Sequence, residues 1–206
     1  MKDLLVLVAD QDAEFLMKSL LDKIPVVESI RVIDYEIIRH PDHDSGVATH
    51  AVEFVRPYIN DYKFLMVTFD HEGSGKESSS QVQLESIVED GLKRNGWQNR
   101  NVCITFKPEL ESWLWVNRQQ LHDVLDWPSG HNIYEWLQLN GYCLQNYKPV
   151  RPKEAFEAAL KKQNIPRSSS LFSKLAQQAS YQQCTDSSFR KFLTTIKLWF
   201  VRKDDA

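Results

Sequence analysis

Two acidic side chains follow one of the most apolar segments of the chain. Asp70 and Glu72 come directly after residues 64–69, and Gly73 and Gly75 follow them. Because side chains two apart at the end of a strand can point the same way, both carboxylates could reach one cation. Magnesium prefers carboxylates, waters and phosphate oxygens, and glycine lets a phosphate approach the backbone. The pattern predicts a magnesium site, with a polar turn of helix-capping acids as the alternative.

Other polar side chains follow the neighbouring apolar segments. Asp10 comes after residues 4–9 and is the next candidate ligand for the same cation. The segment 40–44 carries enough donors for a transition metal, but Pro41 and the short spacing favour an irregular turn there. Four side chains are therefore predicted only to line the site: His40, His43, Asp44 and His71.

The elements that must position these residues alternate between strand and helix. Apolar runs predict strands at residues 4–9, 29–39, 64–69 and 101–106. Helical spacing of apolar residues, with Pro25 closing the first, predicts helices at 12–23, 47–58 and 81–94. Such alternation indicates an α/β fold with a mainly parallel four-stranded sheet and helices on both faces. In open parallel sheets the functional groups gather beyond the carboxyl ends of the strands, where the acids named above lie.

The rest of the chain is predicted to be a helical extension. From Glu109 onward the strand signal stops, and helices are expected near 109–125, 131–139, 152–163, 168–179 and 186–201. We therefore divide the chain into an α/β core, residues 1–115, and a C-terminal extension, residues 116–206.

The charged residues are unevenly distributed along the chain. The formal net charge is −3, but residues 148–206 carry 12 Lys and Arg against 5 Asp and Glu, so the rest is acidic. A basic segment beside an acidic one is a hint of contact with a polyanion, although two solvated faces of opposite sign would look the same. Four side chains are candidates for holding the backbone phosphates of a nucleic acid: Lys107, Lys148, Arg151 and Lys153.

Several classes of protein are excluded by the sequence. No apolar run approaches the roughly 18 residues that a membrane span needs, so we expect a cytoplasmic protein without a membrane partner. Three cysteines in no regular spacing disfavour structural disulfides and a zinc knuckle. The segment GSGKES at 73–78 lacks the spacing of a phosphate-binding P-loop, so ATP binding is not predicted.

The segment VTFDHEGSG resembles the TOPRIM domain of topoisomerases, primases and OLD-type and RloB-like nucleases. The resemblance covers about the first 115 residues, and Asp70 and Glu72 fall on the family's paired metal acids. The segment from Lys107 to Leu114 is similar to the E-x-W-L element of small RloB-like members, in which Glu111 would face the same site. Pieces of the extension resemble small TOPRIM-like proteins of bacterial phage-defence islands.

The resemblance implies a metal-dependent phosphodiesterase. Mg2+, or Mn2+ in its place, would be held by Asp70 and Glu72, with Asp10 as general base or further ligand and Glu111 as a fourth catalytic carboxylate. One departure matters, because the family's glutamate at the end of the first strand falls on Ala9 or Val8. Asp10, one residue on, could replace it, and if its carboxylate does not reach the site, metal could bind without cleavage.

Two hypotheses follow. The first is a nuclease acting on DNA or RNA in bacterial antiviral defence. The second is a catalytically degenerate TOPRIM-like module that binds or regulates the other proteins of a defence complex.

Overall fold

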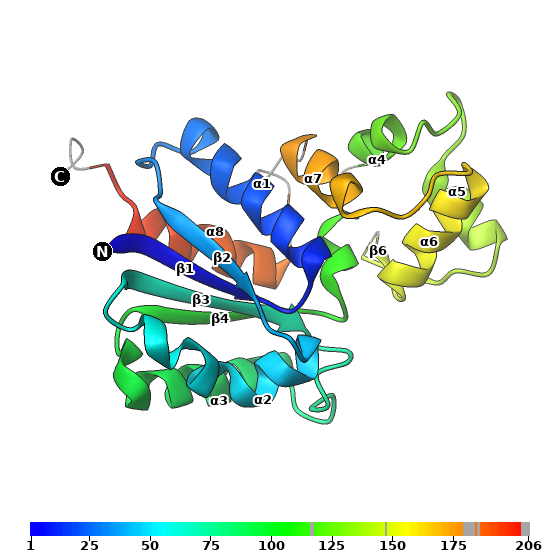
Figure 1. The fold of residues 1–206 in the computed structure, drawn as a ribbon. Coiled ribbons are helices and arrows are strands. Elements are labelled where there is room, and N and C mark those ends of the chain that lie inside the picture. The colour runs from blue at the N-terminus through cyan, green and yellow to red at the C-terminus, as the bar shows by residue number, and fades with distance from the viewer. Residues whose placement is uncertain (116–117, 147, 179–183, 185, 203–206) are drawn as a thin grey trace.

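A four-stranded parallel sheet forms the centre of the molecule (Figure 1). The computed structural model describes residues 1–115, 118–146, 148–178, 184 and 186–202. The sheet has the order β2-β1-β3-β4. Its strands are β1 (Lys2–Val8), β2 (Tyr35–Arg39), β3 (Tyr62–Asp70) and β4 (Asn101–Phe106). This confirms the predicted α/β class with a parallel sheet.

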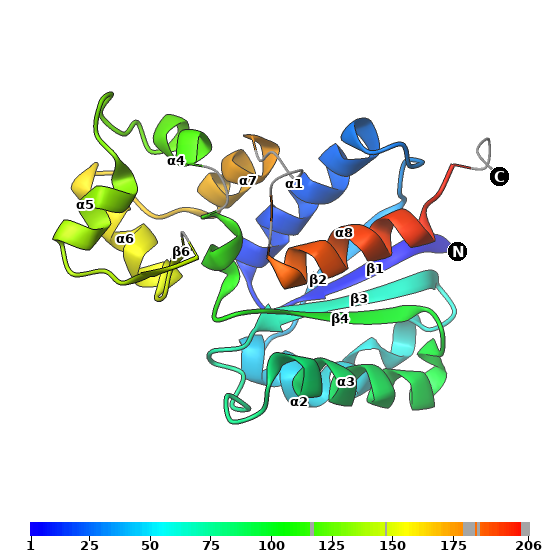
Figure 2. The same ribbon diagram turned by 180° about the vertical axis from the view of Figure 1, so that it is seen from behind.

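Helices cover both faces of this sheet (Figures 1 and 2). One face carries α2 (His43–Val55) and α3 (Gln81–Leu92), and the other carries α1 (Gln11–Val27) and α8 (Ser187–Trp199). Side chains of β1 alternate between the two faces: Leu5 and Leu7 join the cluster under α2 and α3, while Val6 and Val8 join the cluster under α1 and α8. All four are fully buried, which is why the strand reads as an unbroken apolar run.

The helical extension packs onto the α/β layers. After the short turn η3 (Leu110–Trp113), it contains α4 (Arg118–Val124), α5 (Ile133–Leu139), α6 (Pro152–Lys162) and α7 (Ser169–Gln178) before α8. Helix α7 packs along α1, and α8 packs on the sheet beside β4. Trp113, Trp115 and Trp127 are buried in the same hydrophobic cluster as Val6 and Val8 of β1. The last helix of the extension is thus one of the layers that enclose the sheet.

The outer edge of β4 is covered by charged side chains. Glu89 accepts the backbone N–H of Cys103 at 2.9 Å, and Glu85 accepts that of Thr105 at 2.8 Å. Lys191 of α8 contacts both carboxylates at 2.8 Å and donates to the Cys103 carbonyl at 2.7 Å. These contacts satisfy backbone groups that would otherwise offer an edge for pairing with another chain.

The structure corrects three details of the predicted elements. The second strand begins at Tyr35 rather than at residue 29, and Ile30 instead forms an antiparallel bridge to Val201. Helix α1 continues past Pro25 to Val27, since one missing N–H costs a single hydrogen bond and Pro25 is buried. A short hairpin, β5 (Leu144–Gln145) with β6 (Lys148–Pro149), interrupts the helical extension. Two residues per strand are too few to give a periodic signal.

Single turns of other helix types follow two of the long helices. After α2 comes η1 (Arg56–Tyr58), and after α3 comes the wider turn η2 (Lys93–Trp97). In η2 the backbone of Gly96 has a φ of 95°, a conformation that favours glycine.

Candidate functional site

Four carboxylates gather where the sheet strands end at their carboxyl side. Asp10 follows β1, Asp70 ends β3, Asp44 lies in the first turn of α2, and Glu111 lies in η3 beyond β4. They lie close enough together that the charges of Asp44, Glu111 and Asp10 each raise the pKa of Asp70. The parallel topology brings these ends together at one edge, as the sequence predicted.

Asp70 is the central member of this carboxylate cluster. Its Oδ1 accepts the backbone N–H of Leu110 at 2.8 Å, and its own N–H donates to Asp44 Oδ1 at 2.8 Å. Burial is the largest cause of a pKa well above the ordinary value for this carboxyl, and repulsion by its acidic neighbours adds to it. Asp70 is thus a buried carboxyl whose charged form one backbone N–H stabilises and its acidic neighbours destabilise.

Asp44, which was predicted only to line the site, is in direct contact with Asp70. Burial raises the pKa of Asp44, and the charge of Asp10 raises it further, whereas the N–H of Asp70 lowers it. It is a candidate ligand on the same footing as Asp10.

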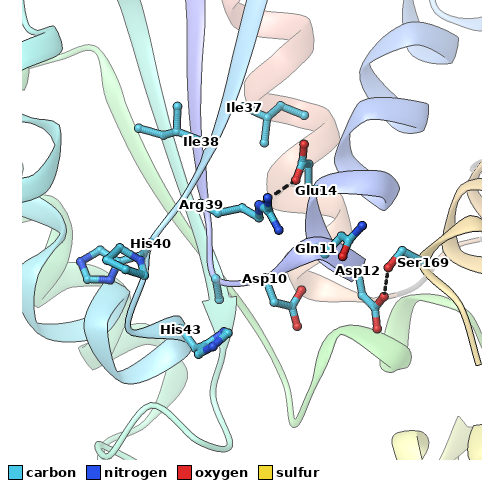
Figure 3. Close-up of a pocket in the computed structure, with 12 residues that line it drawn as sticks. Asp10, Gln11, Asp12, Glu14, Ile37, Ile38, Arg39, His40, His43 and Ser169 are labelled. Atoms are coloured by element: carbon cyan, nitrogen blue, oxygen red, sulfur yellow. Dashed lines mark hydrogen bonds and ion pairs between the residues drawn. The ribbon is translucent and has the colours of Figure 1, made fainter.

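Asp10 is the first residue after β1 that can face the site. Val8 and Ala9 are both buried, one on each face of the sheet, so neither position could present a glutamate to solvent. Asp10 caps α1, its Oδ1 accepting the N–H of Ala13 at 2.8 Å. Figure 3 shows its carboxylate projecting into the same open space as the ring of His43. The shift by one residue therefore still places an acid within electrostatic reach of Asp70.

That open space is a cavity of about 810 Å³ at the ends of β1 and β2. Arg39 pairs with Glu14 on its wall at 3.0 Å, and Ser169 donates to Asp12 at 2.6 Å (Figure 3). Its size lies within the roughly 300–1,000 Å³ typical of small-molecule sites. The lining includes Asp10, Asp12, His40, His43 and Ser169.

Glu111 is held by an arginine from the extension. Arg167, between α6 and α7, donates through Nη2 to Glu111 Oε1 and to Asp12 Oδ2, each at 2.7 Å. Its Nη1 reaches the exposed Glu157 at 3.0 Å. Glu111 is only 2% exposed, and burial raises its pKa although Arg167 opposes the rise. Burial works against the charge on Arg167, yet its hydrogen bonds and charge interactions with Asp12 and Glu111 raise the pKa of the guanidinium above its ordinary value.

Glu72 and His71 lie differently from Asp70. Glu72 is exposed, and its N–H donates to the carbonyl of Pro108 at 3.0 Å. Its charge contributes to raising the pKa of Glu109. His71 is buried, and its Nε2 lies 2.9 Å from the carbonyl of Ser79, where it holds the loop. Asp44 is therefore more closely associated with Asp70 than Glu72 is.

His40 lines the cavity but is occupied by structural contacts. It is buried against Phe54 at a ring separation of 4.6 Å, and its Nδ1 accepts the N–H of Asp42 at 3.1 Å. Gly46 permits this, since a Cβ there would meet His40 Nδ1 at 2.3 Å. His43 is exposed and remains available to a ligand.

The four candidate phosphate-binding side chains have different surroundings. Lys107 is exposed, whereas Lys148 pairs with Asp186 at 2.9 Å and Arg151 pairs with Glu154. Lys153 approaches Glu109 at 3.5 Å. Its burial opposes the charge, but Glu109, Glu111 and Asp70 raise the pKa of Lys153 overall. Lys153 is thus the candidate that is electrostatically coupled to the cluster.

The donor atoms of the cluster are of the type that binds a hard cation. All are carboxylate oxygens, which Mg2+ and Mn2+ prefer. Within the described residues, no three His, Cys, Asp or Glu side chains already stand in a group that could hold a metal ion. A cation would thus have to draw the carboxylates closer together.

Comparison with known proteins leaves the family open. No protein-family model, curated protein or solved structure gives a significant match to this chain. Among the described residues, no helix is long and apolar enough to cross a membrane.

Arg167 is the residue of this site that the sequence did not indicate. Its partners Asp12 and Glu111 lie 155 and 56 residues earlier in the chain, and nothing in the segment PRSSS predicts such contacts. Only the packing of α7 on α1 brings it there.

Proposed function

We propose that this protein is a Mg2+-dependent phosphodiesterase that acts on nucleic acid. The observation that carries the proposal is Asp70, a carboxylate whose pKa is driven up by burial and by Asp44, Glu111 and Asp10 at the carboxyl end of a parallel sheet. A buried cluster of like charges is unfavourable unless a cation binds it. The resemblance of the 70–75 loop and of Glu111 to TOPRIM nucleases supports the same function.

The residues best placed to hold the metal are Asp70, Asp44 and Asp10, with the exposed Glu72 at the rim. When bound, Mg2+ would polarise the scissile phosphate and stabilise the leaving oxygen. Asp10 has one oxygen engaged in capping α1. Its other oxygen has no hydrogen-bond partner among the described residues and could accept a proton from an attacking water.

Positive side chains offset the charge that develops on the phosphate. Lys153 and Arg167 are the cations coupled to the cluster, and both come from the extension. Lys107 lies at the end of β4, exposed and able to reach a phosphate farther along a strand. The extension would in this way bind the nucleic acid, while the α/β layers hold the metal.

The test is cleavage of plasmid, single-stranded DNA and RNA with Mg2+ or Mn2+. We expect cleavage that EDTA abolishes and that Asp70→Ala and Asp44→Ala each reduce at least a hundredfold. Asp61→Asn is the matched control, because Asp61 is exposed and precedes β3 at the opposite end of the strand. Cleavage that survives EDTA, or loss in the Asp61 variant alone, would contradict the proposal.

A second candidate is a binding or regulatory subunit that does not cleave, and one observation favours it. Arg167 already neutralises Glu111 and Asp12, and the buried Val8 and Ala9 leave no room for the family's first glutamate. Binding of Mn2+ and nucleic acid with no cleavage of any substrate would select this candidate. Either activity within an anti-phage defence system, with other defence proteins as partners, is a proposal that rests on the resemblance.

A further inference from the structure

Another cavity is lined by the turn that follows β4. Its volume is about 360 Å³. The turn contributes Lys107, Pro108 and Ser112, the β5–β6 hairpin contributes a second part of the lining, and Asp186 at the start of α8 completes it. None of the four clustered carboxylates described above lines this cavity. It is therefore a separate place at which a ligand could bind.

Ser112 contributes a buried hydroxyl to the wall of this cavity. The residue is only 4% exposed, and no described residue forms a hydrogen bond with its Oγ. Most buried polar side-chain atoms in folded proteins have a partner, because an unpaired one loses its hydrogen bonds to water without replacement. A ligand oxygen in the cavity would supply the partner that Ser112 lacks.

Two lysines bring positive charge to the same cavity. Lys107 is exposed and forms no ion pair with any described residue. Lys148 donates to Asp186 Oδ2 at 2.9 Å, which leaves two of its three ammonium N–H groups without a partner among the described residues.

Asp186 is the one carboxylate in the lining, and it is already satisfied. Its Oδ1 accepts the backbone N–H groups of Ser188 and Phe189, at 3.0 and 3.2 Å, and its Oδ2 accepts from Lys148. The start of α8 thus shares the neutralisation of this carboxylate with Lys148. With two lysines against one aspartate, the lining has an excess of positive charge that favours an anion.

We propose that this cavity binds a phosphate group. Phosphate oxygens accept several hydrogen bonds at once, and lysine commonly binds them as a point charge. The hydroxyl of Ser112 and the side-chain amides of Gln145 and Asn146 can donate to the same group. The volume lies in the lower part of the roughly 300–1,000 Å³ typical of small-molecule sites, so a nucleotide sugar could enter with its phosphate.

The turn from Lys107 to Ser112 also connects this cavity to the carboxylate cluster. The carbonyl of Pro108 accepts the N–H of Glu72 at 3.0 Å, and Leu110 donates to Asp70 Oδ1 at 2.8 Å. A nucleic acid with one phosphate in the cavity would therefore lie beside the proposed metal site. That the phosphate belongs to a nucleic acid rests on the proposed function, whereas binding of phosphate by the cavity does not.

The first experiment measures binding of a fluorescently labelled single-stranded oligonucleotide to the full-length protein in EDTA, so that no metal or cleavage is involved. Lys107→Gln should weaken binding several-fold and reduce the slope of log affinity against log salt concentration by about 0.7, as expected for one lost contact with a single strand. Ser112→Ala should weaken binding by about 2- to 10-fold and leave this slope unchanged, because it removes an uncharged donor.

Lys93→Gln is the matched control for the loss of one lysine charge. Lys93 is exposed and lies in η2, which precedes the start of β4, whereas the cavity follows the end of that strand. This variant should keep both the affinity and the slope. Thermal unfolding of each variant checks that the fold is retained.

The second experiment distinguishes the sources of the phosphate. Inorganic phosphate and adenosine 5′-monophosphate are titrated into the wild type, Lys107→Gln and Ser112→Ala by calorimetry, and each is used to compete with the oligonucleotide. We expect the mononucleotide to bind, to displace the oligonucleotide and to lose affinity in both variants. Binding of the oligonucleotide alone, weakened in both variants, would show that the cavity takes a phosphate only as part of a strand.

The possible results separate the inference from the proposed function. Equal affinities of the wild type and the two folded variants for every probe would overturn the inference, as would failure of the wild type to bind any probe. Weaker binding in both variants, in a protein that cleaves no nucleic acid with Mg2+ or Mn2+, would support the inference and count against the phosphodiesterase. Binding of phosphate or the mononucleotide without the oligonucleotide would also support the cavity as a phosphate site and count against a nucleic-acid substrate.

Discussion

At the scale of single residues, Asp70 is a buried carboxyl whose ionised form is unfavourable in the folded protein. Its carboxylate has one backbone donor, from Leu110, and three acidic neighbours that raise its pKa. Asp3 is compensated instead: it is held by Arg31 at 2.5 Å and Lys63 at 2.9 Å, which lower its pKa despite burial. The contrast makes Asp70 a candidate functional residue, because its ionised form is unfavourable in the folded protein.

The first prediction concerns stability and pH. A carboxyl whose folded pKa lies above its unfolded value of about 3.8 binds protons more tightly when folded. Its ionisation therefore destabilises the fold above the raised pKa, and the penalty disappears as pH falls toward the unfolded value. We expect Asp70→Asn, in EDTA, to raise the melting temperature at pH 7.5 by about 2–4 °C per kcal/mol relieved.

The measurement is thermal unfolding of wild type and variant followed by circular dichroism at several pH values. The gain should shrink steadily on acidification and be absent near pH 4. Asp61→Asn should have no effect at either pH, because Asp61 is exposed. A loss of stability in Asp70→Asn at pH 7.5 would show that the ionised carboxylate supports the fold.

The second prediction concerns the pH dependence of metal binding. Mn2+ must displace the proton of Asp70, so its affinity should fall as pH drops through the raised pKa. Asp44→Asn removes a neighbouring charge that raises this pKa. The acid limb of the affinity profile should therefore move to lower pH in this variant, even if the affinity at high pH is weaker. Calorimetric titrations across pH would show an unmoved limb if Asp44 had no influence.

At the scale of elements, the turn from Lys107 to Ser112 connects the sheet to the site. Leu110 donates its N–H to Asp70, and Glu111 receives Arg167, so one turn positions two of the four carboxylates. Along the outer edge of β4, charged side chains from α3 and α8 bind the backbone of the strand. The same strand is thus held by hydrogen bonds along its edge and carries the site at its end.

The third prediction concerns this covered edge. Replacing Lys191 with Met would leave Glu85 and Glu89 without their shared ammonium while both remain bound to β4. Breaking a fully buried pair costs about 3–5 kcal/mol, and we expect about 2 kcal/mol here because the Lys191 side chain is 34% exposed. Urea unfolding measures the loss. Lys93→Met removes an exposed pair with Asp90 and should cost under about 1 kcal/mol.

At the scale of the whole molecule, the extension is part of the enclosure of the sheet. Phe64 of β3 stacks on Trp199 of α8 at 4.5 Å, and Trp113 contacts Phe189 at 4.9 Å. One hydrophobic cluster runs from β1 through α1 to α6, α7 and α8. Cooperative unfolding of the chain is the physical consequence, because neither part buries this surface alone.

The fourth prediction tests this cooperativity. Residues 1–115 produced alone should fail to fold or should aggregate, because removing α8 exposes the part of one sheet face that α1 does not cover. Phe192→Ala in the full chain should destabilise it by about 3–5 kcal/mol, since Phe192 is fully buried, and the single urea transition should be kept. A soluble, cooperatively folded 1–115 fragment, or two separate transitions, would instead support independent domains divided at residue 115.

The sequence alone determined the local elements and the acids that follow them. Periodicity reports which face of an element is buried, so the four strands, their helices and the placement of Asp10 and Asp70 could be predicted. Strand ends in a parallel sheet converge by topology, so their gathering could be inferred as well. The prediction that Pro25 ends the first helix was wrong because burial of Pro25 overrides its local signal, and the β5–β6 hairpin was not predicted because its strands are too short to give one.

Only the tertiary structure decided which charges meet. Arg167 reaches Glu111 and Asp12 because α7 packs on α1, and Asp44 joins Asp70 because α2 begins beside β3. Lys148, a candidate for contacting phosphate, is paired with Asp186. Partners of a long polar side chain depend on the relative positions of elements far apart in the chain, and no local pattern encodes them. The sequence placed the carboxylates at one edge of the sheet, and packing placed an arginine among them.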